Sequence, residues 1–341
     1  MTIRRRLPDR KSRVTLTDVA RLANVSEITV SRIMRDKGPV ADATRERVMA
    51  AVRSMGYVPN RIAGSLASSD SNLIGVVIPS LSNIVFPEVL SGIHAALKET
   101  AFQPVVGVTE YDTSTEESLV RSLLAWKPAA MIVTGFDHTE ATRRMLEQSG
   151  IRIAELMDID PDPIDIAVGL SMGRAGYETG TYLLKRGYRR FGYVGHNWSL
   201  DKRAQRRYEG FLKALAEAGL GVEALAIIDG PTSALAGRAM TADLLAKAKA
   251  IDVAVFSNDD MAVGGVFHCL SAGIKVREQL GIFGFNGLDI GRALPMELST
   301  IRSNRFKIGK LAVEQILSDS RRSETPTVVD TGFEIIVGET A

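Results

Sequence analysis

Side chains that could serve as nucleophiles, general bases or metal ligands are few and scattered in this sequence. The one cysteine, Cys269, lies in an apolar run typical of a core helix. The four histidines have no metal-ligand spacing; they are His94, His138, His196 and His268. No phosphate-binding Walker loop is present either. We therefore predict that the chain is not an enzyme and needs no metal ion or cofactor.

The clearest chemical pattern lies at residues 26 to 32, SEITVSR, where polar side chains could hydrogen-bond to DNA bases and phosphates. Ser26 is a good N-cap for a helix, and Val25 and Val30 have the spacing of a hydrophobic staple. Val30 and Ile33 then face inward. The side chains left exposed at the start of this helix are Glu27, Ile28, Thr29, Ser31 and Arg32.

Two further helices must position this one. Thr15 is a good N-cap and Asp18 can complete a capping box, which predicts a helix over residues 16 to 23. A third amphipathic pattern covers residues 42 to 55. Three short helices of this kind favour a helix-turn-helix that presents its second helix to the major groove. A generic three-helix domain is the alternative that local patterns leave open.

The distribution of charge along the chain favours a DNA-binding function. Residues 1 to 61 carry 14 Lys and Arg against 6 Asp and Glu, a net charge of +8, whereas the whole chain has +2, which leaves −6 for residues 62 to 341. A basic head on an acidic body is what phosphate neutralisation requires, and it predicts binding that weakens steeply with salt.

Residues 57 to 72, YVPNRIAGSLASSDSN, begin with a proline and end in a serine-rich linker. The short helical pattern between them, at about residues 60 to 67, is too short to be stable alone. In a dimer on DNA, two such segments could pack together and insert Leu66 into the minor groove as an apolar wedge. A flexible tether is the alternative.

From residue 73 onward, short apolar runs alternate with amphipathic helices, which is typical of parallel sheets with helical crossovers. The alternation occurs twice, and about 270 residues are too many for one core, so we predict two α/β subdomains. We expect helices near residues 84–100, 115–125, 139–149, 173–187, 201–218, 233–249 and 259–272. Ligands of such sheets bind at the carboxyl ends of the strands, here in a cleft between the subdomains.

Polar groups follow these strands and are candidate ligand contacts. Asn258 could cap the next helix instead of holding a ligand, and Arg207 could bind a carboxylate with two hydrogen bonds or pair with a neighbouring acid. The candidate contacts to a small molecule are Ser80, Phe86, His138, Asp158, Arg207, Asn258 and Asn286.

Several motifs together resemble the Lac repressor (LacI type) family of bacterial transcription regulators. They are TLTDVARLANVSEITVSRIMR, the later ATRERVMAAVRSMGYVPNR with AGSLAS, SNDDMAVGG and GFNGLDIGRALPMELSTI. Within that family, PSLSNIVFPEVLSGI, ELMD followed by DIAVG, and GFNGLDIG resemble the gluconate-operon repressor branch. The resemblance covers nearly the whole chain.

The resemblance implies an N-terminal all-α helix-turn-helix head and an α/β body similar to a periplasmic sugar-binding protein, with two doubly wound parallel-sheet subdomains. It implies a homodimer, in some relatives a tetramer, on a pseudo-palindromic double-stranded operator. By position, it assigns base reading to Glu27, Ile28 and Thr29. Phosphate contacts fall to Ser26 and Ser31, with Thr15 and Arg32 nearby, and minor-groove contacts to Asn60, Ala63 and Leu66.

The sequence departs from the family pattern at three places. Asn286 replaces a frequent aspartate, which suits an anionic ligand because a buried carboxylate would repel it. Ser171 and Met172 replace an Asp-Asn pair at the subdomain crossover. Ala41 stands where a serine usually caps the third helix, at a cost of ~1 kcal/mol unless Asp42 caps instead.

Family topology gives the expected domain bounds: a head over 1–59, ordered from about 14, a hinge over 60–71, and a body over 72–341. The N-subdomain should combine 72–171 with 302–320, and the C-subdomain 172–301 with 321–341. The final residues, FEIIVGETA, contain no leucine heptad for tetramerisation, so we expect a dimer. The helix around residues 86 to 96 should contribute to its interface.

We therefore predict a cytoplasmic repressor of sugar-acid catabolic genes, released from DNA by gluconate or a related or phosphorylated sugar acid. A neutral sugar, a nucleobase or corepression within the same family remain alternatives. A solute-binding protein for a transporter is a remote one, because residues 1 to 18 lack an apolar signal core. No run reaches the ~18 apolar residues of a membrane helix.

Overall fold

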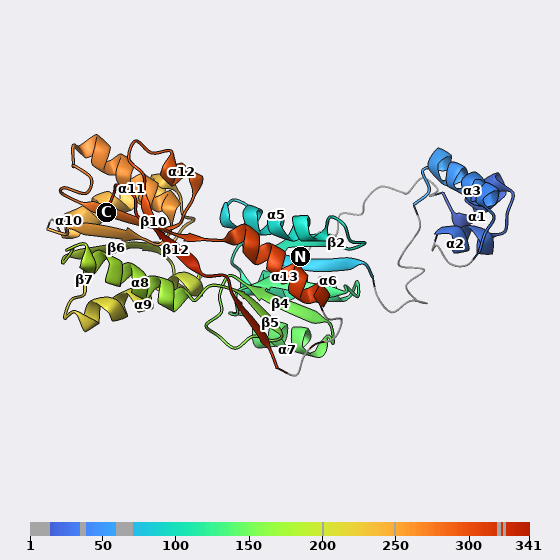
Figure 1. The fold of residues 1–341 in the computed structure, drawn as a ribbon, viewed down its shortest axis with the longest axis horizontal. Helices are drawn as coiled ribbons and strands as arrows, with labels where there is room; N and C mark the ends of the chain where they lie inside the picture. The colour runs from blue at the N-terminus through green and yellow to red at the C-terminus, as the bar shows by residue number, and fades with distance from the viewer. Residues whose placement is uncertain are drawn as a thin grey trace, which may run out of the picture. The chain divides into compact units, whose positions relative to one another are not determined.

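The computed structural model describes residues 14–34, 39–58, 71–199, 201–248, 250–318, 322 and 325–341. The chain divides into two compact units, Met1–Ser69 and Asp70–Ala341. Figure 1 shows the first, the head, in blue and the second, the body, in cyan to red. The predicted hinge helix, with Asn60, Ala63 and Leu66, lies outside the described residues.

The described helices of the head are α1 (Leu16–Ala23), α2 (Glu27–Met34) and α3 (Asp42–Met55). The bounds of α1 and α3 confirm those predicted from the sequence, and α2 begins directly after the predicted N-cap Ser26. One buried cluster joins all three helices, and its members are Val19, Ala20, Ala23, Val30, Ile33, Val48 and Ala51. The head is therefore held by a core of small aliphatic side chains.

Helix capping in the head agrees with the sequence prediction at one end and exposes a defect at another. The side chains of Thr15 and Asp18 form both halves of a capping box at the start of α1, and Asn24 ends that helix in the left-handed conformation at φ 51°. Ala41, the N-cap residue of α3, leaves that helix without a side-chain cap bond. Asp42 does not replace the missing serine.

The N-subdomain of the body contains a six-stranded described sheet with the order β11-β5-β4-β3-β1-β2, all parallel. Helices α5 and α13 pack on one face and α6 and α7 on the other. The bounds are β1 (Leu73–Ile78), α5 (Val85–Leu97), β2 (Gln103–Val108), α6 (Thr113–Leu124), β3 (Ala130–Thr134), α7 (Glu140–Gln148), β4 (Arg152–Leu156), β5 (Ile166–Gly169), α13 (Arg305–Ser318) and β11 (Thr327–Asp330).

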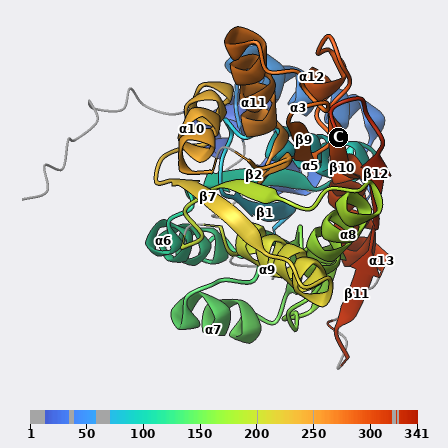
Figure 2. The same ribbon diagram turned by 90° about the vertical axis from the view of Figure 1, so that its left-hand side faces the viewer.

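The C-subdomain contains a second six-stranded described sheet, β12-β10-β9-β8-β6-β7, in which only β12 runs antiparallel, against β10. Helices α8 and α9 cover one face and α10 and α11 the other (Figures 1 and 2). The bounds are α8 (Met172–Lys185), β6 (Phe191–His196), α9 (Lys202–Glu217), β7 (Val222–Ile228), α10 (Ala234–Lys247), β8 (Val253–Phe256), α11 (Asp259–Ala272), β9 (Gly281–Asn286), α12 (Asp289–Arg292), β10 (Ser299–Ser303) and β12 (Phe333–Ile336).

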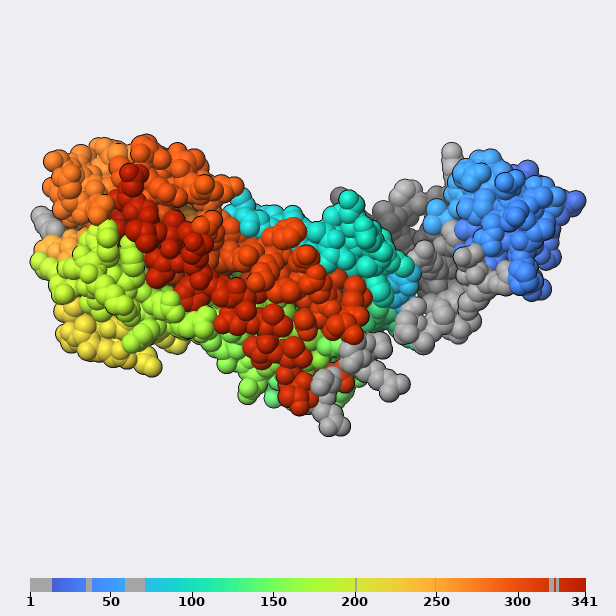
Figure 3. Space-filling view, in the orientation of Figure 1, coloured from blue at the N-terminus to red at the C-terminus, as the bar shows by residue number. Residues whose placement is uncertain are grey.

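The chain crosses between the subdomains three times, after β5, after β10 and after β11. The expectation that residues 321–341 lie wholly in the C-subdomain is wrong. β11 pairs in parallel with β5, starting at Thr327 opposite Ile166, because α13 returns the chain beside the open edge of the N-subdomain sheet. Figure 3 shows the C-terminal segment, in red, on the surface of both subdomains.

The short strands β5 and β10 were not predicted from the sequence. Among the described residues, no helix is long and apolar enough to span a membrane.

Candidate functional site

The second helix of the head presents several predicted DNA contacts to solvent. Ile28 is 72% exposed, and Ser26, Glu27 and Arg32 are exposed as well, whereas Thr29 and Ser31 are half-buried. Most of the apolar surface of Ile28 remains exposed after folding and is available to a ligand such as a thymine methyl group.

Local hydrogen bonds hold this surface. The Thr17 hydroxyl donates to Glu27 Oε1 over 2.7 Å, and the hydroxyls of Ser26 and Thr29 lie 2.9 Å apart. Thr15 is engaged in the cap of α1. Sequence reasoning missed Thr17, which lies in the first turn of α1, ten residues before Glu27.

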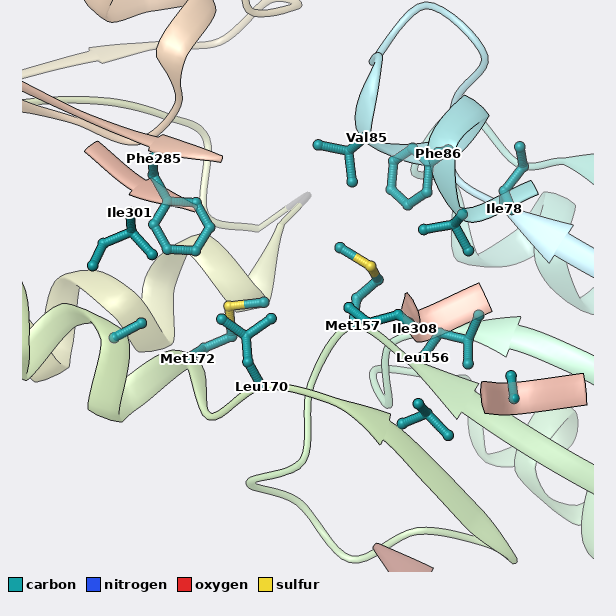
Figure 4. Packing of buried hydrophobic residues seen from close by; sticks show 14 of the residues in the cluster. Ile78, Val85, Phe86, Leu156, Met157, Leu170, Met172, Phe285, Ile301 and Ile308 are labelled. Carbon is teal, nitrogen blue, oxygen red and sulfur yellow. The ribbon is translucent and has the colours of Figure 1, made fainter. Parts of the chain in front are cut away.

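The body contains a cavity of about 410 Å³ between its two subdomains. Five of the seven candidate effector contacts line it: Ser80, Phe86, Arg207, Asn258 and Asn286. Figure 4 shows apolar side chains facing one another across it, with Val85, Phe86 and Met157 from the N-subdomain and Met172 and Phe285 from the C-subdomain. Its size and mixed lining are typical of a small-molecule site.

Arg207 brings a positive charge to this cavity without a direct ion-pair partner. Its Nη2 donates to the carbonyl oxygen of Ser257 over 3.0 Å, and its guanidinium lies over the ring of Phe285 at 4.0 Å. Within the described part of the chain, no carboxylate lies within the 4.0 Å of an ion pair with Arg207. Removal from water lowers the pKa of its guanidinium. An anionic ligand would restore the balance.

Arg203, one turn earlier on α9, is compensated. Its Nε lies 3.3 Å from Asp201 Oδ1, and His196 Nε2 lies 3.5 Å from Asp201 Oδ2. Burial opposes ionisation of Asp201, but the charges of Arg203 and Arg207 and the hydrogen bond from His196 outweigh it and hold the pKa of this carboxyl well below its usual value. Asp201 also caps α9.

Other polar groups at the cavity are acidic or neutral. Glu110, Asp229 and Asp260 line it, and burial raises the pKa of Asp260. Asn258 Oδ1 accepts from the backbone N–H of Met261 over 3.0 Å, so Asn258 caps α11, which was the alternative role considered from the sequence. Asn258 lines the cavity as well.

His138 and Asp158 do not reach the cavity, so their prediction as effector contacts is corrected. His138, with a side chain 1% exposed, lies 3.0 Å from Glu116 and 3.5 Å from Glu155. Burial opposes its protonation, but these two carboxylates raise the pKa of His138 to about 9. Asp158 is fully buried and pairs with Arg206 at 2.9 Å. Both are committed to contacts within the protein.

The residues at the cavity that sequence reasoning missed include Tyr111, His196, Asp201 and Arg203. Arg203 precedes Arg207 by four positions, which places both on one face of a helix, and this spacing was a usable signal. No such signal exists for Tyr111, which adopts φ 62° directly after Glu110 at φ 50°. Two successive non-glycine residues with positive φ form a strained turn, and such turns are common at binding sites.

One pentapeptide has the spacing of a nucleophile elbow: GLSMG, residues 169 to 173. Ser171 has an unstrained φ of −67°, and its hydroxyl accepts from the backbone N–H of Arg174 as the N-cap of α8. The serine is therefore a capping residue at the subdomain crossover.

The cavity also holds the residue types of a catalytic triad, in Ser257, His196 and Asp201. The Ser257 hydroxyl lies 3.4 Å from His196 Nδ1, and His196 Nε2 lies 3.5 Å from Asp201. Both distances exceed the ~2.6 to 3.2 Å of an activated nucleophile, and Asp201 is held by Arg203. The described residues include no group of three or more side chains arranged to hold a metal ion.

Two family models match the chain. "Periplasmic binding proteins and sugar binding domain of LacI family" matches residues 71–329, and "Bacterial regulatory proteins, lacI family" matches residues 15–60.

Relatives match along nearly the full length. The HTH-type transcriptional regulator GntR of Pseudomonas aeruginosa is 40% identical over 329 residues, which cover 96% of this chain and 95% of that protein. The regulator of the same name from Escherichia coli is 34% identical over 330 residues, covering 96% and 99%. The crystal structure of a LacI family transcriptional regulator from Silicibacter pomeroyi is 44% identical, covers 96% of this chain and 99% of that one, and superposes with a TM-score of 0.92.

Proposed function

The chain belongs to the lacI family of bacterial regulatory proteins, DNA-binding regulators of transcription, and from this premise we propose that it represses sugar-acid catabolic genes until a small sugar acid releases it from DNA. The observation that carries the effector class is Arg207, a guanidinium in the cavity without a carboxylate partner. D-gluconate is the acid we propose first, and the cytoplasm is where the protein would act.

In the head, α2 would read one operator half-site in the major groove. Ile28 would contact a thymine methyl group and Glu27 would accept from a cytosine amino group, with Thr29 beside them. Ser26, Ser31 and, on the flanks, Thr15 and Arg32 would bind phosphates. Asn60, Ala63 and Leu66 would serve the minor groove.

In the cavity, Arg207 would bind the carboxylate of the effector. The side-chain amides of Asn258 and Asn286 and the hydroxyl of Ser80 would bind its hydroxyl groups, and Phe86 would cover its carbon chain. Because Glu110, Asp229 and Asp260 line the same cavity, a second negative charge would be repelled. The charge balance therefore favours a free monocarboxylate over a phosphorylated sugar acid.

Binding would be linked to DNA through the cleft. Effector that favours one arrangement of the two subdomains changes the separation of the heads in a homodimer, and so the affinity for a pseudo-palindromic operator. A ~100-fold release corresponds to ~2.7 kcal/mol of coupling. Exposed Leu81 and Ile84, beside the start of α5, support the proposal that this region joins the dimer interface.

Fluorescence anisotropy tests the proposal. A labelled duplex, selected by the full chain from a randomised pool, is titrated with protein in the presence of D-gluconate, 6-phosphogluconate, a neutral hexose or a nucleobase. We expect release by D-gluconate at micromolar to millimolar concentration, and loss of that release in Arg207→Ala with DNA affinity retained. Arg143→Ala, which removes a half-buried arginine on α7 outside the cavity lining, is the matched control.

Release by the hexose or the nucleobase alone would refute the sugar-acid assignment, but the protein would still be a ligand-responsive DNA-binding regulator. Tighter binding in the presence of gluconate would make the acid a corepressor. Absence of saturable, salt-sensitive DNA binding would refute the proposal as a whole.

A further inference from the structure

Arg305, the first residue of α13, joins the two subdomains behind the effector cavity. Its side chain is 5% exposed. Its Nε and Nη2 donate to the two carboxylate oxygens of Glu88 on α5, each over 2.9 Å. Its Nη1 donates to the carbonyl oxygen of Asn286, at the end of β9 in the C-subdomain. One buried guanidinium thus spans a helix of one subdomain and a strand end of the other.

Asn286 is an unusual end point for such a contact. It lines the cavity and adopts φ 121°, a conformation that a non-glycine residue holds only when its surroundings impose it. Arg305 binds the carbonyl of this same residue. A displacement of the Asn286 backbone by a ligand would therefore act directly on Arg305.

The helix at the other end of this contact is rigidly tied to its neighbour. A Cβ added to Gly92 on α5 would lie 2.0 Å from the carbonyl oxygen of Phe306, and one added to Gly309 on α13 would lie 2.0 Å from that of Val89. The backbones of α5 and α13 thus touch, and the two helices lie side by side in Figure 1. Close packing of this kind transmits a displacement instead of absorbing it.

Helix α5 therefore meets the cavity at two points. Phe86 lines it directly, and Glu88, two residues later, is connected to the opposite wall through Arg305 and Asn286. A ligand that contacts both Phe86 and Asn286 therefore acts on α5 in two ways, directly at Phe86 and through Arg305 at Glu88.

We infer that Arg305 is a positioning residue that carries effector occupancy from Asn286 to Glu88 on α5, and so sets how strongly the effector changes DNA affinity. The inference rests on the proposed function, because it needs an effector in the cavity and DNA on the head. Arg305 touches neither. Its substitution should reduce the coupling between the two ligands and leave binding of each one intact.

The test measures the coupling ratio, the DNA dissociation constant with saturating D-gluconate divided by that without it, by anisotropy on the full chain. Affinity for D-gluconate is measured separately by the fluorescence of Trp198, which stacks on Tyr208 next to Arg207, in a Trp126→Phe background. Glu88→Gln keeps the shape of the side chain and removes its charge. Glu314→Gln is the matched control, because it removes an equally exposed carboxylate from α13.

We expect Glu88→Gln to lower the coupling ratio at least tenfold while the affinity for D-gluconate changes less than threefold, and Glu314→Gln to alter neither. Arg305→Lys, which loses the forked geometry, should lower the ratio as much, and the double variant no further, because both act on one path. Equal ratios in Glu88→Gln and Glu314→Gln would overturn the inference. Absence of any release in the unsubstituted chain would instead overturn the proposed function, and the inference with it.

Discussion

The head and the cavity of the body solve recognition in opposite ways. The head displays exposed side chains, such as Ile28, fixed by partners no more than ten residues away, as in the bond between Thr17 and Glu27. The cavity gathers mostly half-buried and buried groups from Ser80 to Asn286, and its charge depends on which arginine has an ion-pair partner. Exposed charge acts through the solvent and is screened by salt, whereas charge within a cleft acts on a ligand at contact.

The largest expected effect is that of salt on the head. With ~6 phosphate contacts, DNA affinity should fall about a thousandfold between ~50 and ~200 mM KCl, because the bound cations displace counterions. Binding of D-gluconate at Arg207 should change less than threefold over the same range. Anisotropy and Trp198 fluorescence measure the two. Equal salt slopes would contradict the contrast between the sites.

The next effect concerns the packing that positions Arg207. A Cβ added to Gly176 on α8 would lie 1.8 Å from the carbonyl oxygen of Arg207, so Gly176→Ala must separate α8 from α9. We expect a loss of about 3 kcal/mol in the unfolding free energy of the body, with effector release lost and α1 to α3 intact. Urea denaturation, monitored by tyrosine and tryptophan fluorescence, measures this loss of unfolding free energy. Gly221→Ala, where the added Cβ meets nothing within 4 Å, should be silent.

Buried charge in the body should make its stability depend on pH. The pKa of His138 is raised from 6.5 to about 9 by Glu116 and Glu155, so its stabilising charge is fully present below pH 6.5 and is lost as the pH rises through about 9. We expect the unfolding free energy of the body to fall by roughly 2 kcal/mol over this window.

Thermal unfolding at several pH values tests this dependence. His138→Gln should be less stable at pH 6 and lack the decline, while exposed His94→Gln should keep the behaviour of the unsubstituted chain. A decline that persists in His138→Gln would assign the titration to another group.

The smallest effect is the missing cap of α3. Ala41→Ser should supply a hydroxyl to the uncapped N–H groups and stabilise the head by about 1 kcal/mol, without any change in the effector response. The melting temperature of the head measures the gain. Ala50→Ser, in the exposed interior of the same helix, should give none.

Sequence patterns predicted the described helices of the head and part of the body, for physical reasons. The bounds of α1, α2 and α3 follow from caps and staples between near neighbours, such as Thr15 and Asp18. The position of β11 does not, because its pairing with β5 joins residues 161 apart at Thr327 and Ile166, and nothing in a four-residue strand specifies its partner.

The candidate site divides in the same way. Arg207 and Phe86 could be located from their places after strands and at helix starts. The role of His138 could not be predicted, because Glu116 and Glu155 reach it from α6 and β4. The positive φ of Asn286 and the contact of its carbonyl with Arg305 are likewise results of tertiary structure.

The three crossovers between the subdomains determine the order in which the body can be completed during synthesis. The N-subdomain begins to leave the ribosome first, yet α13 and β11, which cover α5 and extend the sheet beside β5, lie after residue 304. Apart from its last strand, the C-subdomain is contiguous from residue 172 to 303 and can fold first. Until α13 has been synthesised, the face of α5 around Ile93 lacks the helix that covers it in the folded protein, and such exposed apolar surface is prone to aggregation.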